Sequence, residues 1–558
     1  MTTATAPTGS PGSPGPAGST ATPIPLSTRL AGASDLLRLA WRRDRILVPA
    51  SVLGLVVLAV GSAQATLELY PTDEAAATGL TGVLSNPSVI ALYGPIASHT
   101  ADALAVFKTV MLGAFLTAVL AFVVVRRHTR TEEDEGRLEL LGAGVVGRWS
   151  PLAAAVTLAS IAVVAASVLS AAGLAALGMD LTGSIAFGVS WLAAGLATVG
   201  VTAVVVQLAS TTRGAAGLGF GFLGAMYALR AIADSADPGT WVHALGWLSP
   251  LGWAGRVEAF GADRQWVLLL GLLTLVVGVL VGVAVLDRRD LGAGLIPARN
   301  GPRRAGPLLT GPVSLVTRLA RGTIIGWTVG MVLGGVVVGS LLGSVADLAT
   351  DPGIKELLEQ LGGTTGTFAD IYVATEIHFV SAAVAAAGIA LVLRLVGAER
   401  SGLGEVVLAT PTSRARWFGA HVLLPVVLTT ALMAILGAAL GVVGPSVTPE
   451  APSFGASVGA TLAALPAVWV MIGVAAALAG ATPRFAPFSW GVLLVTFLAT
   501  EIGPMTNLPS WLLDLSPFTH LSPLPGGAFE PVSAAALTLL AAALVVAGLM
   551  AYRRRDVA

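Results

Sequence analysis

Side chains that could perform chemistry are few in this chain of 558 residues, and their spacing forms no active site. Thiol nucleophiles and thiolate metal ligands are excluded because the sequence contains no cysteine. The histidines lack the short spacings that are typical of metal ligands; they are His99, His128, His243, His378, His421 and His520. We therefore predict neither an enzyme nor a metal site.

The sequence also lacks a nucleotide-binding motif. The two lysines, Lys108 and Lys355, follow Phe107 and Ile354. A phosphate-binding P-loop needs a Gly-Lys pair, so that backbone amides surround the phosphates while the ammonium group contacts them. We expect no cofactor on this chain, and any step driven by ATP then needs a second polypeptide.

The densest group of ionisable residues is an acidic cluster made of Glu132, Glu133, Asp134 and Glu135. It is followed by Gly136, Arg137, Glu139, Leu140 and Leu141. The spacing of Glu135 and Glu139 predicts a short helix with both on one face and leucines on another. One alternative is a loop whose charges only fix membrane topology, but topology depends on basic residues rather than acids. We therefore favour a docking surface.

The same spacing occurs again 266 residues later in the chain. Glu133, Gly136, Glu139, Ala143 and Arg148 correspond to Glu399, Gly402, Glu405, Ala409 and Arg414. Two further landmarks recur: Ser249-Pro250 as Ser516-Pro517, and Arg288-Arg289-Asp290 as Arg554-Arg555-Asp556. Repetition on this scale indicates a tandem duplication.

The elements that position these loops are membrane spans. The chain is 55% hydrophobic and only 11% charged, against roughly 25% charged residues in soluble domains. Apolar runs of bilayer length, about 20 residues, predict an all-α polytopic membrane protein of twelve transmembrane helices in two six-helix halves. They lie at 46–65, 103–125, 151–177, 185–209, 215–233, 266–286, 323–345, 373–396, 418–443, 457–480, 486–503 and 533–552.

Orientation follows from arginines, which stay on the cytoplasmic side when loops are short. Arg38, Arg42, Arg43 and Arg45 precede the first span, and five more arginines occupy the loop after the second. The first outer loop contains Glu68, Asp73 and Glu74 but no basic residue before Lys108. Both termini are therefore expected in the cytoplasm, and the protein in the cell membrane.

The predicted domains are a disordered tail (1–25), a first half with an N-terminal elbow helix (26–290), a linker with a second elbow (291–322) and a second half (323–558). The elbows, at 28–45 and 308–321, mix leucines with arginines and are expected in the membrane interface; simple juxtamembrane anchoring is the alternative. The seventh span carries glycines at four-residue spacing, which favours close helix packing; they are Gly326, Gly330, Gly334, Gly335, Gly339 and Gly343.

Ionisable residues within spans lie near the predicted outer ends, where side chains can contact the interface; they are Lys108, Arg230, Glu376, His378 and Glu501. The span centres are uncharged, which favours a cavity for a lipophilic molecule over a proton relay. Glu376 and Glu501 are candidates for the substrate pathway, with a purely structural role as the alternative.

The acidic loop, the elbow before the first span and the downstream Gly147-Arg148 resemble the permease of type-2 ATP-binding-cassette (ABC) exporters. The chain is most similar to the fused, twelve-span actinobacterial kind associated with export of polyketide antibiotics and other drugs. The resemblance implies that the loops at 126–150 and 397–417 are coupling helices for two copies of a cytoplasmic ATPase, which would bind the ATP and Mg.

In the resemblance, the coupling residues of the first loop are Glu132, Glu133, Gly136, Arg137, Glu139, Leu140 and Leu141, with Asp134, Glu135 and Arg148 beside them. The second loop departs from this pattern, because Arg400 and Ser401 replace acids and Leu403 replaces the arginine. The two ATPase contacts are therefore expected to be unequal. The expected cargo is a lipophilic small molecule, and no nucleic acid is expected as a partner.

Two other readings compete with the exporter. A proton-coupled twelve-span drug antiporter also has two six-span halves, but it usually carries a different loop motif after the second span. A membrane enzyme acting on a lipid phosphate needs acidic or histidine clusters that hold a metal. No second cluster completes such a site here.

Overall fold

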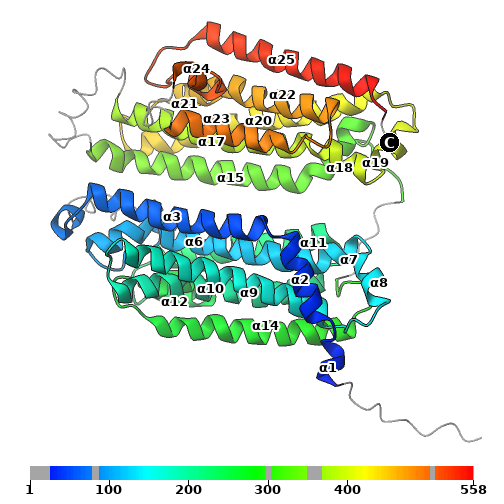
Figure 1. Ribbon diagram of the computed structural model, residues 1–558. Coiled ribbons are helices and arrows are strands. Elements are labelled where there is room, and N and C mark those ends of the chain that lie inside the picture. Colours follow the sequence, from blue (N-terminus) through cyan, green and yellow to red (C-terminus); the bar gives the residue numbers. More distant parts are fainter. Residues whose placement is uncertain (1–24, 78–86, 297–302, 349–366, 503–508, 557–558) are drawn as a thin grey trace, which may run out of the picture. The chain divides into compact units, whose positions relative to one another are not determined.

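The structure, a computed structural model, describes residues 25–77, 87–296, 303–348, 367–502 and 509–556 (Figure 1). The tail expected over residues 1–25 lies outside them except for Pro25. In the described part of the chain the regular structure is helical and no strand forms. This agrees with the predicted all-α class.

Eleven helices of the described chain are long and apolar enough to cross a membrane. They are built on α3 (Leu47–Leu69), α6 (Ala101–Arg126), α9 (Ser150–Ala176), α10 (Leu181–Leu208), α11 (Thr212–Asp234), α14 (Leu268–Arg288), α15 (Pro312–Leu348), α17 (Phe368–Val392), α20 (Arg414–Val447), α21–α22 (Phe454–Ala463 and Leu465–Ala481) and α25 (Pro531–Arg554). Each covers a predicted span. The remaining predicted span, 486–503, contains α23 (Phe488–Ile502), whose 15 residues are fewer than the usual span length.

Shorter helices connect the long ones. They are α1 (Leu26–Arg29), α2 (Ala33–Arg43), α5 (Pro87–Tyr93), α12 (Trp241–Ala244), α13 (Gly252–Arg256) and α24 (Ser510–Leu513), with 3₁₀ turns η2 (Leu245–Leu248), η3 (Gln265–Val267) and η5 (Pro517–His520). By contacts, the chain forms two compact units. The first comprises residues 1–61, 113–225 and 264–298, and the second comprises 62–112, 226–263 and 299–558.

The core of the first unit is built around α10, which packs against α9 and α14. Small residues allow this close approach. A Cβ atom added at Gly271 of α14 would lie 2.6 Å from the carbonyl oxygen of Ala193 on α10. Thr198 and Thr202 are buried in α10 and donate their hydroxyls to backbone carbonyls one turn earlier, so the helix interior leaves these hydroxyl groups satisfied.

In the second unit, α15 packs on α20 and α22 packs on α25. The two predicted glycine rows of α15 have different environments. Gly335 and Gly339 lie against α20, where a Cβ at Gly335 would lie 2.8 Å from the carbonyl oxygen of Leu436. Gly326 and Gly330 have no atom within 4 Å of an added Cβ. Close packing is therefore confirmed for one row and not for the other.

The two elbow sequences form different structures. The first elbow contains α2, which packs on α9 and ends at Asp44 before α3 begins. Asp44 is fully buried and contacts His128 at 2.7 Å and Arg127 at 2.9 Å. In the second elbow, residues 312–321 belong to the 37-residue helix α15 and are not a separate helix.

Candidate coupling site

The first repeated loop begins as a direct extension of α6. One π-helical turn, η1 (Arg127–Thr131), and the short α7 (Glu132–Asp134) continue that helix. The chain then breaks at Gly136, where φ is +72°, and α8 (Arg137–Gly142) starts a new direction. Glycine suits this left-handed position because side chains are strained there.

The break corrects one prediction from the sequence. Glu135 and Glu139 were expected on one face of a single helix. Glu135 instead follows the end of α7, while Glu139 lies in the first turn of α8. Four-residue spacing places two side chains on one face only when the helix between them is continuous, and Gly136 interrupts it.

The second loop repeats this geometry. The segment α18 (Arg394–Arg400) precedes Gly402, whose φ is +73°, and α19 (Leu403–Leu408) follows it. Both α8 and α19 have six residues, and their bounds differ by the offset of the sequence repeat. The duplication therefore preserves the break and the short helix, although most of the side chains differ.

A buried carboxylate anchors the first loop. Glu133 is 8% exposed, and its two oxygens accept from the guanidinium of Arg289 at 2.6 and 2.9 Å. The backbone amide of Gly292 donates to the same carboxylate at 2.6 Å, and Arg130 lies 3.2 Å away. A two-pronged arginine contact of this kind fixes both distance and orientation.

The second loop has the same anchor at the equivalent residues. Glu399 is buried, and Arg555 donates to it at 2.6 Å. We call the pairs Glu133–Arg289 and Glu399–Arg555 the Glu–Arg clamps. Each clamp joins a repeated loop to the residues that follow the last long helix of its half, α14 or α25. The repetition of the contact in both halves indicates that it serves the architecture of the loop.

A second arginine braces the end of each clamp. Arg148 donates to the carbonyls of Leu286, at 2.7 Å, and of Arg289. Its counterpart Arg414 donates to the carbonyl of Arg555 at 2.7 Å. Both predicted arginines, Arg148 and Arg414, therefore bind backbone carbonyls at the end of a long helix. They attach the loop to that helix and are not part of the outer faces of α8 and α19.

The outer faces of the short helices are exposed and partly apolar. On α8, Glu139 is exposed and Leu140 is 79% exposed. The equivalent residues of α19, Glu405 and Val406, are also exposed, Val406 by 68%. Each short helix therefore presents one exposed apolar side chain beside an exposed carboxylate on its outer face.

The inner face of α8 covers a small cavity. Leu141 and the adjacent Leu138 line it together with both clamp residues, Glu133 and Arg289, and with Gln207 of α10. The cavity has a volume of about 90 Å³. The space between α8 and the clamp is therefore not completely filled by side chains.

The two loops are held unequally. Glu132 of the first loop pairs with Arg43 of α2 at 2.6 Å, whereas the equivalent residue of the second loop is Ala398. The position of Arg130 is taken by Val396. Asp134 accepts from the amide of Thr212, and Glu135 pairs with Arg137. The first loop therefore carries more ionic attachments to its unit than the second.

The predicted pathway residues are less well defined by the structure. Glu376 is half-buried in α17 and shares a hydrogen bond with Tyr372, one turn earlier. Glu501 belongs to the last turn of α23, but its side chain lies outside the described residues. Among the described residues, Tyr93 and Tyr372 lie close enough to Glu376 to interact with its charge.

Arg230 differs from its expected position at the interface. It is fully buried, donates to the carbonyl of Leu92 at 3.0 Å and pairs with Asp234 at 3.3 Å. Asp234 also contacts Arg256 at 3.4 Å. Burial of Arg230 is tolerated because a carboxylate and backbone carbonyls replace the water that a guanidinium group loses on burial. Arg230 thereby links α11 to α5.

Sequence reasoning missed the function of Arg289 and Arg555. Both served as landmarks of the duplication, yet neither was assigned to the coupling site. The signal was present, because a charged residue retained at one offset together with Glu133 and Glu399 suggests a paired contact. Arg43 and Arg130 had no such signal, because the second half does not repeat them.

Known proteins resemble this chain over most of its length. Residues 309–553 match the family model described as multidrug efflux system permease Rv1217c, C-terminal domain. The chain is 37% identical over 529 residues to the multidrug efflux system permease protein Rv1217c of Mycobacterium tuberculosis, covering 94% of this chain and 95% of that protein. With its membrane-length helices, the chain is thus a multi-pass membrane protein that belongs to the family of multidrug efflux system permeases represented by Rv1217c.

Proposed function

We propose that this protein is the membrane permease subunit of an ATP-driven exporter of the type-2 ABC class, carrying lipophilic small molecules out of the cell. In this proposal the chain has twelve spans in two halves, with both termini in the cytoplasm. Two copies of a separate ATPase bind α8 and α19 and supply the ATP and Mg chemistry. The observation that carries the proposal is the duplicated short helix, which has an exposed outer face and directly follows a buried Glu–Arg clamp.

The outer faces provide the docking surface. Leu140 and Val406 present apolar side chains, and Glu139 and Glu405 each add a carboxylate beside them. An apolar residue that enters a partner's pocket, with a charge at its rim, combines affinity with a fixed orientation. The occurrence of the same pattern in both loops suits a pair of identical partner subunits.

The two clamps provide the mechanical link. A displacement of α8 acts on Glu133 through a few residues of backbone, and the Glu133–Arg289 clamp passes it to the end of α14. The second clamp does the same for α25. Movement of the ATPase pair can therefore tilt long helices in both halves, if the ATPase binds the two states of the permease with different affinity.

The experiment uses the two exposed apolar residues. Leu140→Arg and Val406→Arg place a charge in the proposed interface without touching the clamps. We expect the double variant to insert and fold normally but to lose at least tenfold in affinity for the ATPase, because one interface hot spot contributes more than 1 kcal/mol. Co-purification with a candidate ABC ATPase, and ATP-dependent efflux, are the measurements.

A matched control is Val532→Arg, at an 81% exposed position in the first turn of α25. It should retain both ATPase binding and efflux. If the double variant at Leu140 and Val406 also keeps normal binding and efflux, the short helices are not the docking surface. Efflux that needs no ATPase and stops on addition of an uncoupler would instead identify a proton-coupled antiporter.

A further inference from the structure

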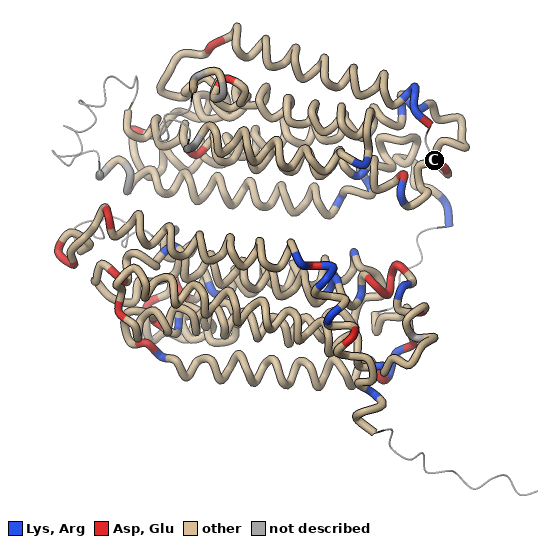
Figure 2. Tube along the Cα trace, viewed as in Figure 1, with Lys and Arg blue, Asp and Glu red and all other residues tan. Residues whose placement is uncertain are grey.

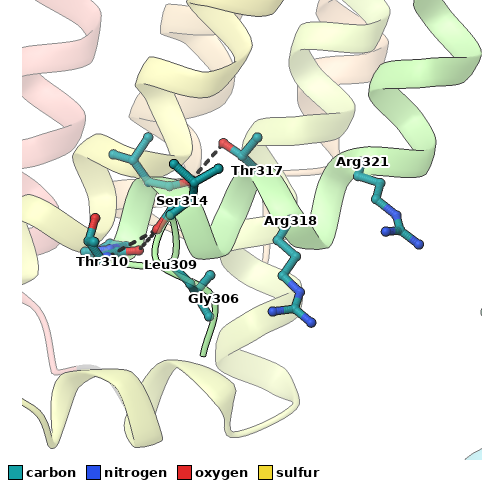
Figure 3. Close-up of a pocket in the computed structure, with 11 residues that line it drawn as sticks. Gly306, Leu309, Thr310, Ser314, Thr317, Arg318 and Arg321 are labelled. Carbon is teal, nitrogen blue, oxygen red and sulfur yellow. Dashed lines mark hydrogen bonds between the residues drawn. The ribbon is translucent and has the colours of Figure 1, made fainter. Parts of the chain in front are cut away.

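A basic hollow lies at the start of α15, and none of the clamp residues lines it. It has a volume of about 800 Å³ and is formed by residues between Gly306 and Arg321. Figure 3 shows Arg318 and Arg321 extending in the same direction from successive turns of the helix. The hydroxyls of Thr310, Ser314 and Thr317 and the side chains of Leu308, Leu309 and Val313 complete the lining.

Within the described ranges, the positive charge of this hollow is not neutralised by an acidic side chain. Arg318 and Arg321 are exposed, and among the residues that the structure describes neither has an acidic partner. The first elbow differs: Arg29 pairs with Asp287, Arg38 with Asp35 and Arg43 with Glu132. Arg303 and Arg304 lie nearby in sequence and are also exposed. The second elbow therefore keeps free cations where the first has internal ion pairs.

An exposed apolar stripe continues from the two arginines along α15. Ile325, Val329 and Val332 follow Arg321 at helical spacing, with exposures of 59%, 51% and 42%. Gly326 and Gly330 follow Ile325 and Val329 in the sequence, and no atom lies within 4 Å of a Cβ added at either glycine. The helix backbone is therefore uncovered at these positions. The start of α15 is thus cationic, and a row of exposed apolar residues continues from it along the helix.

The place of the hollow relative to the membrane follows from its neighbours. Arg394, at the start of α18, donates to the carbonyl of Leu319 at 3.0 Å and to the hydroxyl of Thr323 at 2.6 Å. The basic end of α15 therefore lies beside the second repeated loop. Among residues 303–556, Figure 2 shows the arginines gathered at the end of the helices that carries α18, α19 and the C-terminus. Arginines concentrate at the cytoplasmic ends of membrane helices, where anionic headgroups attract basic residues.

We propose that this hollow binds one anionic phospholipid of the leaflet next to the coupling loops. The phosphate of the headgroup contacts Arg318 and Arg321, with the Thr310 hydroxyl at the rim, and an acyl chain lies along Ile325 and Val329. Guanidinium groups match phosphate oxygens in geometry and charge. Basic pockets at the end of a membrane helix typically recognise such headgroups.

The test measures lipid binding to the purified full-length protein by native mass spectrometry, with phosphatidylglycerol as probe and phosphatidylcholine as zwitterionic reference. We expect phosphatidylglycerol to bind more tightly, and R318Q/R321Q to weaken its binding by roughly tenfold or more. R318K/R321K should keep most of the binding, because it retains the charge. Phosphatidylcholine binding should be the same in all variants.

R553Q/R554Q is the matched control, since it removes two exposed arginines from the same end of the second half without touching the hollow. It should change phosphatidylglycerol binding less than twofold. Equal losses in R318Q/R321Q and in this control would overturn the site in favour of general surface charge. The proposal is also wrong if R318Q/R321Q binds like the unchanged protein, or if free inorganic phosphate competes as well as the lipid does.

Discussion

The clamps show how one buried carboxylate can be compensated in two ways. Glu133 has Arg289 and Arg130 within ion-pair distance and a backbone amide as well. Glu399 has its ion pair with Arg555, and Val396 takes the place of the second arginine. A buried charge that loses its partner costs about 3–5 kcal/mol, so the first clamp is expected to tolerate the loss of an arginine better.

This difference predicts an order of stability. Arg555→Ala leaves Glu399 buried without a cation and should lower the apparent Tm more than Arg289→Ala does, because Arg130 still compensates Glu133. Adding Glu399→Gln to Arg555→Ala should restore part of the loss, since it removes the unpaired charge. Thermal unfolding followed by tryptophan fluorescence measures the order.

The matching pair in the first half supplies the control. Adding Glu133→Gln to Arg289→Ala should give no gain, because that change leaves Arg130 without its acid. Equal apparent Tm values for Arg289→Ala and Arg555→Ala, or a gain from Glu133→Gln, would show that the two clamps are energetically alike.

At the scale of elements, the loop depends on one left-handed glycine in each half. Gly136 and Gly402 have open space around an added Cβ, so any cost of substitution comes from the backbone conformation alone. That cost is about 1–2 kcal/mol for most residues and smaller for asparagine. The direction of α8 and α19, rather than their packing, is what these glycines set.

Gly136→Val with Gly402→Val should therefore reduce ATPase-coupled efflux while membrane insertion is unchanged. Asparagine at both positions should retain most of the efflux, because asparagine adopts this conformation more readily. Efflux and insertion are measured in the same cells. If valine and asparagine variants perform equally, the turn at these glycines has no bearing on coupling.

The spans could be predicted because each is a long apolar run. A run long enough to cross the bilayer is a strong sequence signal for a membrane helix. A short helix in the first loop was also predicted, from the spacing of Glu135 and Glu139, although these two residues lie on either side of the break. A helix in the second loop was implied only by the family resemblance. The break at Gly136 was not, because a glycine inside a charged run does not reveal its backbone angle. The clamps were missed because Glu133 and Arg289 are 156 residues apart and only the fold brings them together.

The elbows show the same limit. Both sequences mix leucines with arginines, yet α2 ends at Asp44 while residues 312–321 continue into α15. Asp44, at the end of α2, is held in a buried position by His128 and Arg127. Sequence periodicity does not contain these tertiary contacts.

At the scale of the whole molecule, the two repeats share one loop geometry. They differ in the contacts that attach each loop to the rest of the protein. Both halves keep the glycine break, the short helix and the Glu–Arg clamp. The first loop adds the Glu132–Arg43 pair to its elbow, and the second half keeps the free arginines of the basic hollow. We interpret the chain as a gate in two related halves whose driving ATPase sites are on another protein.

The most direct test reconstitutes the purified chain in liposomes, alone and with its partner ATPase, and follows a lipophilic fluorescent substrate. The account predicts concentrative transport only when the ATPase and Mg-ATP are both present, and none from the chain alone under a proton gradient. Concentrative transport by the chain alone would contradict it.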